Sequence, residues 1–152
     1  MEENKLTKEF ELFNKISTKI ENTHMYSPAQ LAYAGDAVYE LLVRSFILNS
    51  HDISVNKMHG LAVKFVKAEA QAYIISKLAD TLTEEEKNIV KRGRNAKVTS
   101  SPKNVDFMDY RYATGFEALL GYLFLSKDVD RLMYIFDRII EIILEKDDNN
   151  CE

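Results

Sequence analysis

YAGDAVYELLV at residues 33–43 and GFEALLGYLFL at residues 115–125 are two apolar segments that each carry one acidic residue close to a glycine. Apolar residues recur in both at intervals of three and four, which is the period of an α-helix rather than of a strand. The acids, Asp36 and Glu117, stand where this pattern asks for an apolar residue. The two segments therefore predict core helices that also provide functional acidic side chains.

Glycines inside these predicted helices indicate where the two helices meet. A glycine in a helix interior costs about 1 kcal/mol relative to alanine. We therefore expect Gly35, Gly115 and Gly121 at places where two backbones approach closely. If the helices cross there, Asp36 and Glu117 face each other in a partly buried site. Two carboxylates at close range require a proton or a cation, and Mg²⁺ or Mn²⁺ is the ion that oxygen ligands favour.

Other acidic residues and the histidines have simpler interpretations. An acid in the middle of a helix most often faces solvent, and that alternative stays open for Asp36 and Glu117 on spacing alone. Glu40 lies one helical turn beyond Asp36, but Arg44 follows four residues later in the order that favours a surface ion pair. Asp106 is expected to cap a helix. The three histidines fall in no spacing typical of a metal site.

The rest of the chain predicts an all-α fold in one domain. The sequence has 152 residues, of which 46% are hydrophobic, and only five glycines and two prolines. The apolar periodicity predicts six helices, and their expected limits are residues 6–20, 28–48, 54–80, 83–93, 109–125 and 128–145. Ser27 and Thr83 are expected to cap two of these helices. We expect an N-terminal helical extension at 1–26, one helical domain at 27–146 and a disordered acidic tail at 147–152.

Positive charge is concentrated in one segment of an otherwise acidic protein. The net charge is −4, yet no acidic residue lies between Glu86 and Asp106. Residues 95–105 are rich in Ser, Thr, Asn and Pro and predict an irregular connection. The acid-free segment between Glu86 and Asp106 is either a phosphate-binding surface or ordinary solubilising charge at a helix C-terminus, where cations interact favourably with the helix dipole. Its candidate RNA-binding residues are Lys91, Arg92, Arg94, Lys97 and Lys103.

The cysteine content and the hydropathy of the sequence indicate the cellular compartment in which the protein is expected. The single cysteine, Cys151, allows no internal disulfide, which favours a reducing compartment such as the cytoplasm. No stretch approaches the roughly 20 apolar residues of a membrane span, and the charged N-terminus is unlike a signal peptide.

The quoted segments resemble the ribonuclease III family. YAGDAVYELLV is similar to its signature motif, and FEALLGYLFL at 116–125 is similar to its second motif. The similarity is greatest to the bacterial Mini-ribonuclease III branch, through KRGRNAK at 91–97, SPKN at 101–104 and YRYATGFEALLGYLFL at 110–125. The resemblance covers residues 27–145.

Departures from full-length ribonuclease III are also visible. The larger enzymes have further acids where this sequence has Ala29, Ala32 and Thr114. They also carry a C-terminal domain that binds double-stranded RNA, whereas only six residues follow Lys146 here. We therefore expect a reduced set of metal ligands, and we expect this one domain alone to bind the RNA.

The resemblance implies a ribonuclease III-like helical bundle that acts as a homodimer and cleaves double-stranded RNA. Asp36 and Glu117 would be the catalytic, magnesium-binding residues, with manganese as a substitute. Magnesium would activate water, and the products would carry 5′-phosphate and 3′-hydroxyl ends. The expected substrate is a stem of precursor 23S ribosomal RNA, with a ribosomal protein as a possible helper.

Two rival functions remain at this point. One is a non-catalytic RNA-binding or ribosome-assembly module on a degenerate nuclease fold, which the missing acids and Thr114 favour. The other is a regulatory helical bundle whose partner is a protein. Retention of both Asp36 and Glu117 favours the enzyme over either rival.

Overall fold

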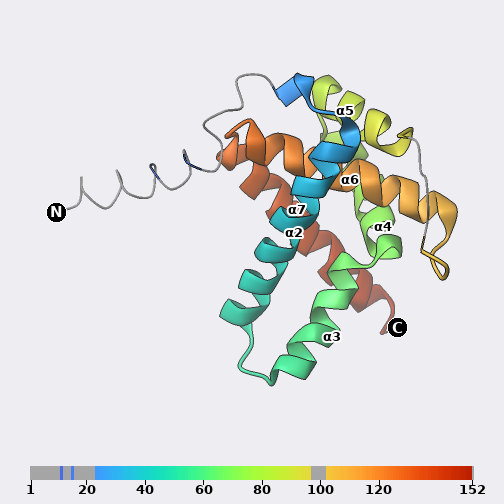
Figure 1. Ribbon diagram of the computed structural model, residues 1–152. Coiled ribbons are helices and arrows are strands. Elements are labelled where there is room, and N and C mark those ends of the chain that lie inside the picture. The colour runs from blue at the N-terminus through green and yellow to red at the C-terminus, as the bar shows by residue number, and fades with distance from the viewer. Residues whose placement is uncertain (1–10, 12–14, 16–22, 97–101, 152) are drawn as a thin grey trace.

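The computed structural model describes Glu11, Lys15 and residues 23–96 and 102–151. Every regular element in these ranges is helical, which confirms the all-α prediction (Figure 1). Of the helix predicted at 6–20, only Glu11 and Lys15 are among the described residues, and both are helical. The elements, in chain order, are η1 (Thr23–Met25), α2 (Pro28–Ser50), α3 (Val55–Val66), α4 (Ala68–Leu78), η2 (Ala79–Thr81), α5 (Glu84–Arg94), α6 (Phe107–Leu125) and α7 (Val129–Asn149).

Local capping sets where several helices begin. Ser27 caps α2, with its side chain accepting from the backbone N–H of Gln30 and with proline at the next position. Thr83 caps α5 through a reciprocal pair of hydrogen bonds with Glu86. Asp106 caps α6 by accepting from two backbone N–H groups of its first turn. These side chains satisfy donors that a helix start leaves without partners, as the sequence predicted.

The single long helix predicted from 54 to 80 is wrong, because the chain breaks into α3 and α4 at Lys67. Lys67 is extended, with φ −61° and ψ 148°. The break frees carbonyl groups at the end of α3, and side chains from other elements take them up. The Tyr39 hydroxyl donates to the Phe65 carbonyl, and Gln71 Nε2 donates to the Val66 carbonyl, both at 2.9 Å.

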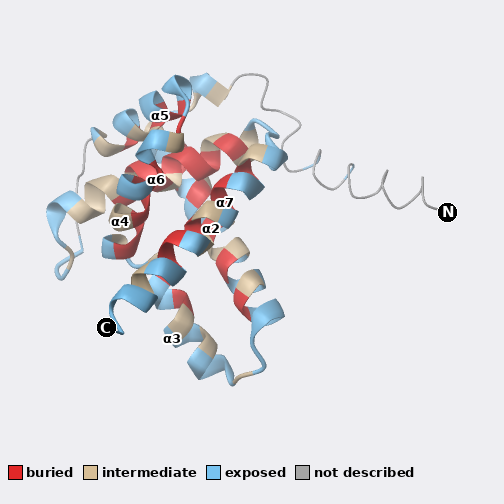
Figure 2. Ribbon diagram, turned by 180° about the vertical axis from the view of Figure 1, so that it is seen from behind, coloured by how far each residue is buried: buried red, intermediate tan, exposed pale blue. Residues whose placement is uncertain are grey.

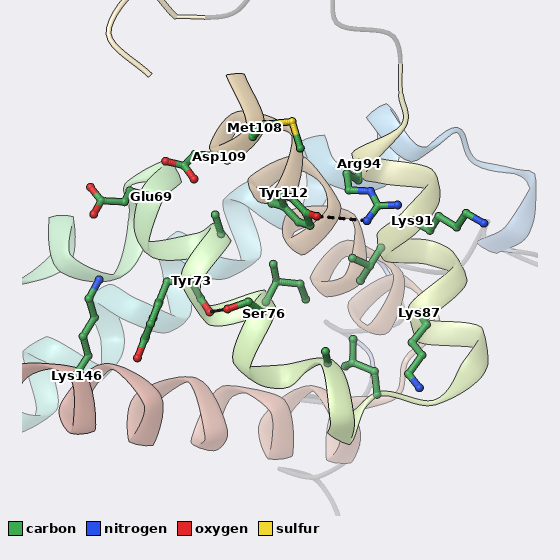
Figure 3. A pocket seen from close by; sticks show the side chains of 15 residues that line it. Glu69, Tyr73, Ser76, Lys87, Lys91, Arg94, Met108, Asp109, Tyr112 and Lys146 are labelled. Carbon is green, nitrogen blue, oxygen red and sulfur yellow. Dashed lines mark hydrogen bonds between the residues drawn. The ribbon is translucent and has the colours of Figure 1, made fainter. Parts of the chain in front are cut away.

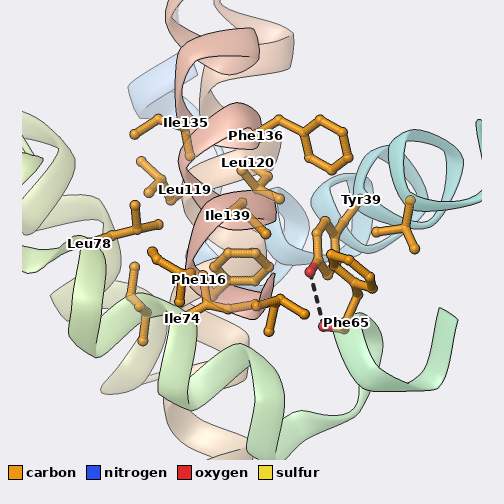
Figure 4. Packing of buried hydrophobic residues seen from close by; sticks show 14 of the residues in the cluster. Tyr39, Phe65, Ile74, Leu78, Phe116, Leu119, Leu120, Ile135, Phe136 and Ile139 are labelled. Carbon is orange, nitrogen blue, oxygen red and sulfur yellow. Dashed lines mark hydrogen bonds between the residues drawn. The ribbon is translucent and has the colours of Figure 1, made fainter. Parts of the chain in front are cut away.

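The core is built around α6. Phe116, Leu119 and Leu120 of this helix are fully buried. The Phe116 ring packs edge-on against Tyr39 of α2, with 4.8 Å between ring centroids (Figure 4). Buried residues accordingly concentrate on α6 and on the faces of α2, α4 and α7 that meet it (Figure 2). The central helix is thus held by apolar contact on several sides, and so is any side chain that it carries.

The last helix runs further than expected. The sequence predicted its end near 145 and a disordered tail after Lys146, but α7 continues to Asn149. Two contacts support the additional turn. The Lys146 ammonium lies 4.4 Å from the centroid of the Tyr73 ring, and Asp147 pairs with Lys64 of α3 at 3.2 Å. None of the described helices is long and apolar enough to span a lipid bilayer.

Candidate active site

The helices α2 and α6 cross with their backbones in contact (Figure 1). A Cβ atom added to Gly35 would lie 1.7 Å from the Glu117 carbonyl oxygen, and one added to Gly121 would lie 1.9 Å from the Leu31 carbonyl oxygen. Any larger residue at either position would force the helices apart. The prediction that these glycines mark a close approach is therefore confirmed.

The third glycine, Gly115, serves a different contact. A Cβ there would lie 2.6 Å from the Val90 carbonyl oxygen, and one on Gly93 would lie 2.8 Å from the Gly115 Cα, so Gly115 meets α5 rather than α2. Close approaches at glycine thus hold α6 against α5 near the middle of the helix, at Gly115, and against α2 further along, at Gly121. Because Glu117 lies between the two, its backbone position is fixed from both sides.

Asp36 and Glu117 are brought together by this crossing, and their electrostatics reflect it. Burial, and then the negative charge of Asp36, raises the pKa of Glu117 from 4.5 to about 7, while a side-chain hydrogen bond with Gln71 acts in the opposite direction. Burial, and then the charge of Glu40, also raises the pKa of Asp36. Asp36 is exposed at the rim, and Glu117 is partly buried behind it. The pair therefore favours a proton or a cation.

Glu40 has a larger role than the sequence predicted. Its pairing with Arg44 is confirmed, with 3.0 Å between Arg44 Nε and Glu40 Oε2. Its charge nevertheless raises the pKa of Asp36, which means that the ion pair does not remove Glu40 from the site. Glu40 thus adds to the negative potential around Asp36, and its position one turn along the same helix face was the signal for this in the sequence.

Gln71 of α4 is a member of the site that sequence reasoning missed. It is only 3% exposed, and its side chain hydrogen bonds with Glu117. The one signal in the sequence was a polar residue among the apolar positions of its helix, next to Ala70 and close to Ile74.

The residues present fit a divalent cation that keeps much of its water. Asp36 and Glu117 supply carboxylate oxygens, and Oε1 of Gln71 is a buried oxygen that accepts no hydrogen bond from the described residues. Thr114 does not extend the set, since its hydroxyl donates to the Tyr110 carbonyl at 3.0 Å. No group of three or more His, Cys, Asp or Glu side chains able to hold a metal occurs in the described part of the chain. Magnesium sites commonly use one or two carboxylates together with water and phosphate oxygens.

Comparison with known proteins establishes the family. The model of the ribonuclease III domain matches residues 29–128. A Mini-ribonuclease 3 from Thermoanaerobacter sp. (strain X514) is 50% identical over 119 residues, which cover 78% of this chain and 84% of the relative. The chain belongs to the Mini-ribonuclease III branch of the ribonuclease III family. It is therefore an endoribonuclease, of a family that acts on double-stranded RNA and generally depends on a divalent metal.

Further relatives agree with this assignment. The Mini-ribonuclease 3 of Clostridium tetani is 45% identical over 127 residues, covering 83% of this chain and 84% of the relative. The crystal structure of a protein from Fusobacterium nucleatum superposes with a TM-score of 0.69 at 32% identity, covering 76% of this chain and 93% of that one. Asp36 and Glu117 both lie inside the region that the ribonuclease III model matches.

The predicted RNA-binding residues of this ribonuclease differ in how exposed their side chains are to solvent. Lys91, Arg92 and Lys103 are exposed, whereas Lys97 lies outside the described residues. Arg94 is half-buried, and its guanidinium lies 5.4 Å from the centroid of the Tyr112 ring and donates to the Tyr112 hydroxyl at 3.5 Å. The exposed cations at the end of α5 are therefore better placed for phosphate than Arg94.

Arg94 and Lys91 also border a pocket of about 660 Å³ that is lined by α4, α5, α6 and α7 (Figure 3). Its interior is mainly apolar. Arg94 points toward the Tyr112 side chain, and Lys91 extends outward from α5. Arg111, which the sequence analysis did not single out, fixes this helix end, because its Nε donates to the Arg94 carbonyl at 2.8 Å.

Proposed function

We propose that this ribonuclease hydrolyses double-stranded RNA with Mg²⁺ held by Asp36 and Glu117, and that Mn²⁺ can substitute. The observation that carries the proposal is the glycine-mediated crossing of α2 and α6, which sets two carboxylates of raised pKa side by side. A hard divalent cation relieves the repulsion between them, since it favours the ionised form of both.

In the reaction, the carboxylates of Asp36 and Glu117 would hold the cation. A bound divalent cation supplies Lewis-acid activation of water and of the scissile phosphate, and it stabilises charge on the leaving 3′ oxygen. Glu117, partly buried and fixed from both sides by α6 packing, defines the inner edge of the site. Asp36 is exposed at the rim, where an RNA phosphate in solution can reach it. The products carry 5′-phosphate and 3′-hydroxyl ends.

Two copies of the chain form the working enzyme in this proposal. The outer face of α2 carries an apolar stripe beside Asp36, in which Tyr33 is 87% exposed, Leu41 67% and Leu48 66%. Val55 of α3 is also exposed, and it lines the same surface pocket as Leu48. Large exposed apolar side chains grouped along one helix favour an interface. A two-fold dimer would relate two active sites by the symmetry that relates the antiparallel strands of a duplex.

The proposed substrate is a helical stem of precursor 23S ribosomal RNA, with a ribosomal protein as helper, on the basis of the resemblance to the Mini-ribonuclease III branch. A-form RNA hides its base edges in a deep groove, so a protein that binds the duplex contacts mainly phosphates and 2′-hydroxyls. The exposed side chains of Lys91, Arg92 and Lys103 suit phosphate contacts. Arg94 and Lys97 complete the proposed RNA-binding segment.

The experiment that tests this function compares a long RNA duplex with single-stranded RNA, each with and without Mg²⁺. We expect cleavage of the duplex only, and only with the metal. The absence of acids at Ala32 and Thr114 favours one alternative, a duplex-binding module without activity. Binding of the duplex without cleavage at any concentration of Mg²⁺ or Mn²⁺ would support that alternative and contradict the proposal.

A further inference from the structure

Gln71 and Glu86 are the buried polar side chains among the described residues. Glu86 has a structural explanation, since it completes the cap of α5 and accepts from Arg131 at 2.8 and 2.9 Å. Gln71 has no comparable set of partners. Its amide lies between α4, the end of α3 and α6, in the neighbourhood of the candidate metal site.

The neighbours of Gln71 determine how its amide is oriented. Nε2 donates to the Val66 carbonyl oxygen at 2.9 Å, and the side chain also hydrogen bonds with the Glu117 carboxylate. A carbonyl and an ionised carboxylate only accept hydrogen bonds, so the NH₂ group must face both. The opposite orientation would set oxygen against oxygen. Oε1 of Gln71 is therefore left as a buried acceptor that no described residue uses.

Packing alone does not account for a glutamine at this position. Its helix neighbours Ala70, Ile74 and Ile75 are buried in the apolar interior. A buried amide oxygen without a donor lowers stability, whereas a methionine of similar shape would fill the same volume without that cost. A locally unfavourable residue in a core is most readily understood where a function requires it.

We propose that Gln71 is a positioning residue for the metal site. Its Nε2 bridges the Val66 carbonyl and the Glu117 carboxylate and thereby holds that carboxylate in the orientation that faces Asp36. This inference rests on the proposed metal-dependent function.

The reduced set of acids explains why such a residue is needed. No group of three or more His, Cys, Asp or Glu side chains that could hold a metal occurs in the described residues, so Asp36 and Glu117 have little help in constraining the ion. Groups that orient metal ligands typically change metal affinity or activity by roughly 10- to 100-fold when they are removed. The break at Lys67 also has a functional explanation, because it exposes the Val66 carbonyl that anchors the amide.

The test replaces Gln71 by methionine, which keeps the shape and removes both hydrogen bonds. Calorimetry on the RNA-free protein measures the affinity for Mn²⁺ and Mg²⁺, and thermal unfolding in EDTA measures stability. We expect Gln71→Met to unfold at the same or a higher temperature than the wild type, to bind the metals about 10-fold more weakly or worse, and to need more Mg²⁺ for cleavage. Ser76→Ala, on an exposed face of the same helix, is the control and should change neither property.

Wild-type metal affinity in Gln71→Met would overturn the proposal. If that variant does not fold, Gln71→Asn provides the second measurement, since its shorter amide cannot reach both acceptors, and wild-type metal affinity in a folded Gln71→Asn would likewise overturn it. Asp36→Asn, measured in parallel, separates this proposal from the proposed function. Unchanged affinity in Asp36→Asn contradicts the metal site itself, whereas unchanged affinity in Gln71→Met alone contradicts only the role of Gln71.

Discussion

Gly35 of α2 lies directly against the Glu117 carbonyl of α6, so that a Cβ at residue 35 would come within 1.7 Å of that oxygen. The same backbone contact that packs the two helices therefore also sets the distance between the two acidic side chains. Fold and site share one structural requirement here, and a change at Gly35 must disturb both.

Gly35→Ala should accordingly destabilise the protein and abolish cleavage. Alanine gains about 1 kcal/mol in helix propensity, but relieving the overlap requires α2 and α6 to separate, and overpacking of this kind costs about 1–3 kcal/mol or more. Gly60→Ala is the matched control, because a Cβ there meets nothing within 4 Å. Chemical denaturation should show that Gly60→Ala is slightly more stable than the wild type. A Gly35→Ala variant of wild-type stability and activity would refute the close approach of the two helices.

The raised pKa of Glu117 predicts how stability depends on pH. A carboxyl whose pKa is higher in the folded state stabilises the fold below its unfolded pKa, and that contribution disappears as pH rises through the folded value. In EDTA, the melting temperature should therefore fall between pH 4.5 and about 7, the two pKa values of Glu117. The raised pKa of Asp36 acts in the same direction.

Glu117→Gln should flatten that dependence, and Mg²⁺ should restore the stability of the wild type near neutral pH. Thermal unfolding of both proteins across this pH range, with and without the metal, is the measurement. Equal slopes for the wild type and Glu117→Gln would show that Glu117 titrates normally.

The basic end of α5 should control duplex affinity rather than catalysis. Arg92→Ala combined with Arg94→Ala should weaken binding to unrelated duplexes, with most of the effect from the exposed Arg92, since Arg94 is engaged with Tyr112. Removal of one cation that binds a phosphate should lower the slope of log affinity against log salt by about 0.7 to 1. Lys57→Ala on α3 serves as the control. If affinity and salt slope stay unchanged in catalytically inactive protein, the segment is ordinary surface charge.

The apolar stripe on α2 should support self-association. We expect sedimentation of the wild type to give a dimer, and Leu41→Glu, at a 67% exposed position, to shift it toward monomer while the helix content is retained. Charge introduced into a buried apolar interface is costly, whereas on a free surface it is nearly neutral. A wild-type monomer that cuts both strands at a normal rate would rule out the dimer.

The pattern of residues was sufficient to predict the helices that cross. Gly35 and Gly121 indicated the crossing, because a glycine in a helix interior is unfavourable unless a neighbouring backbone needs the space. The caps Ser27, Thr83 and Asp106 marked where helices begin, since their side chains act on their own local backbone. Information of this kind is local, and sequence reasoning recovers it.

Features that depend on tertiary structure were missed. FVKAEAQAYII at 65–75 keeps an unbroken helical period without proline or glycine, so nothing local shows the break at Lys67. The partners of the freed carbonyls, Tyr39 and Gln71, come from α2 and α4. The last turn of α7 likewise depends on side chains of other helices, Lys64 of α3 and Tyr73 of α4. Gln71 is a polar residue among the apolar positions of its helix, but its burial, which depends on the fold, is what distinguishes it from an exposed glutamine.

The most direct test of the central claim is single-turnover cleavage of an RNA duplex in Mg²⁺ by Asp36→Asn and by Glu117→Gln. Each variant removes a negative charge and leaves the packing in place. We predict that both stay folded, bind the duplex as the wild type does and cleave it more than about 100-fold more slowly, since even groups that only orient metal ligands are worth 10- to 100-fold. Near-normal turnover by either variant would contradict the assignment of that residue to the metal.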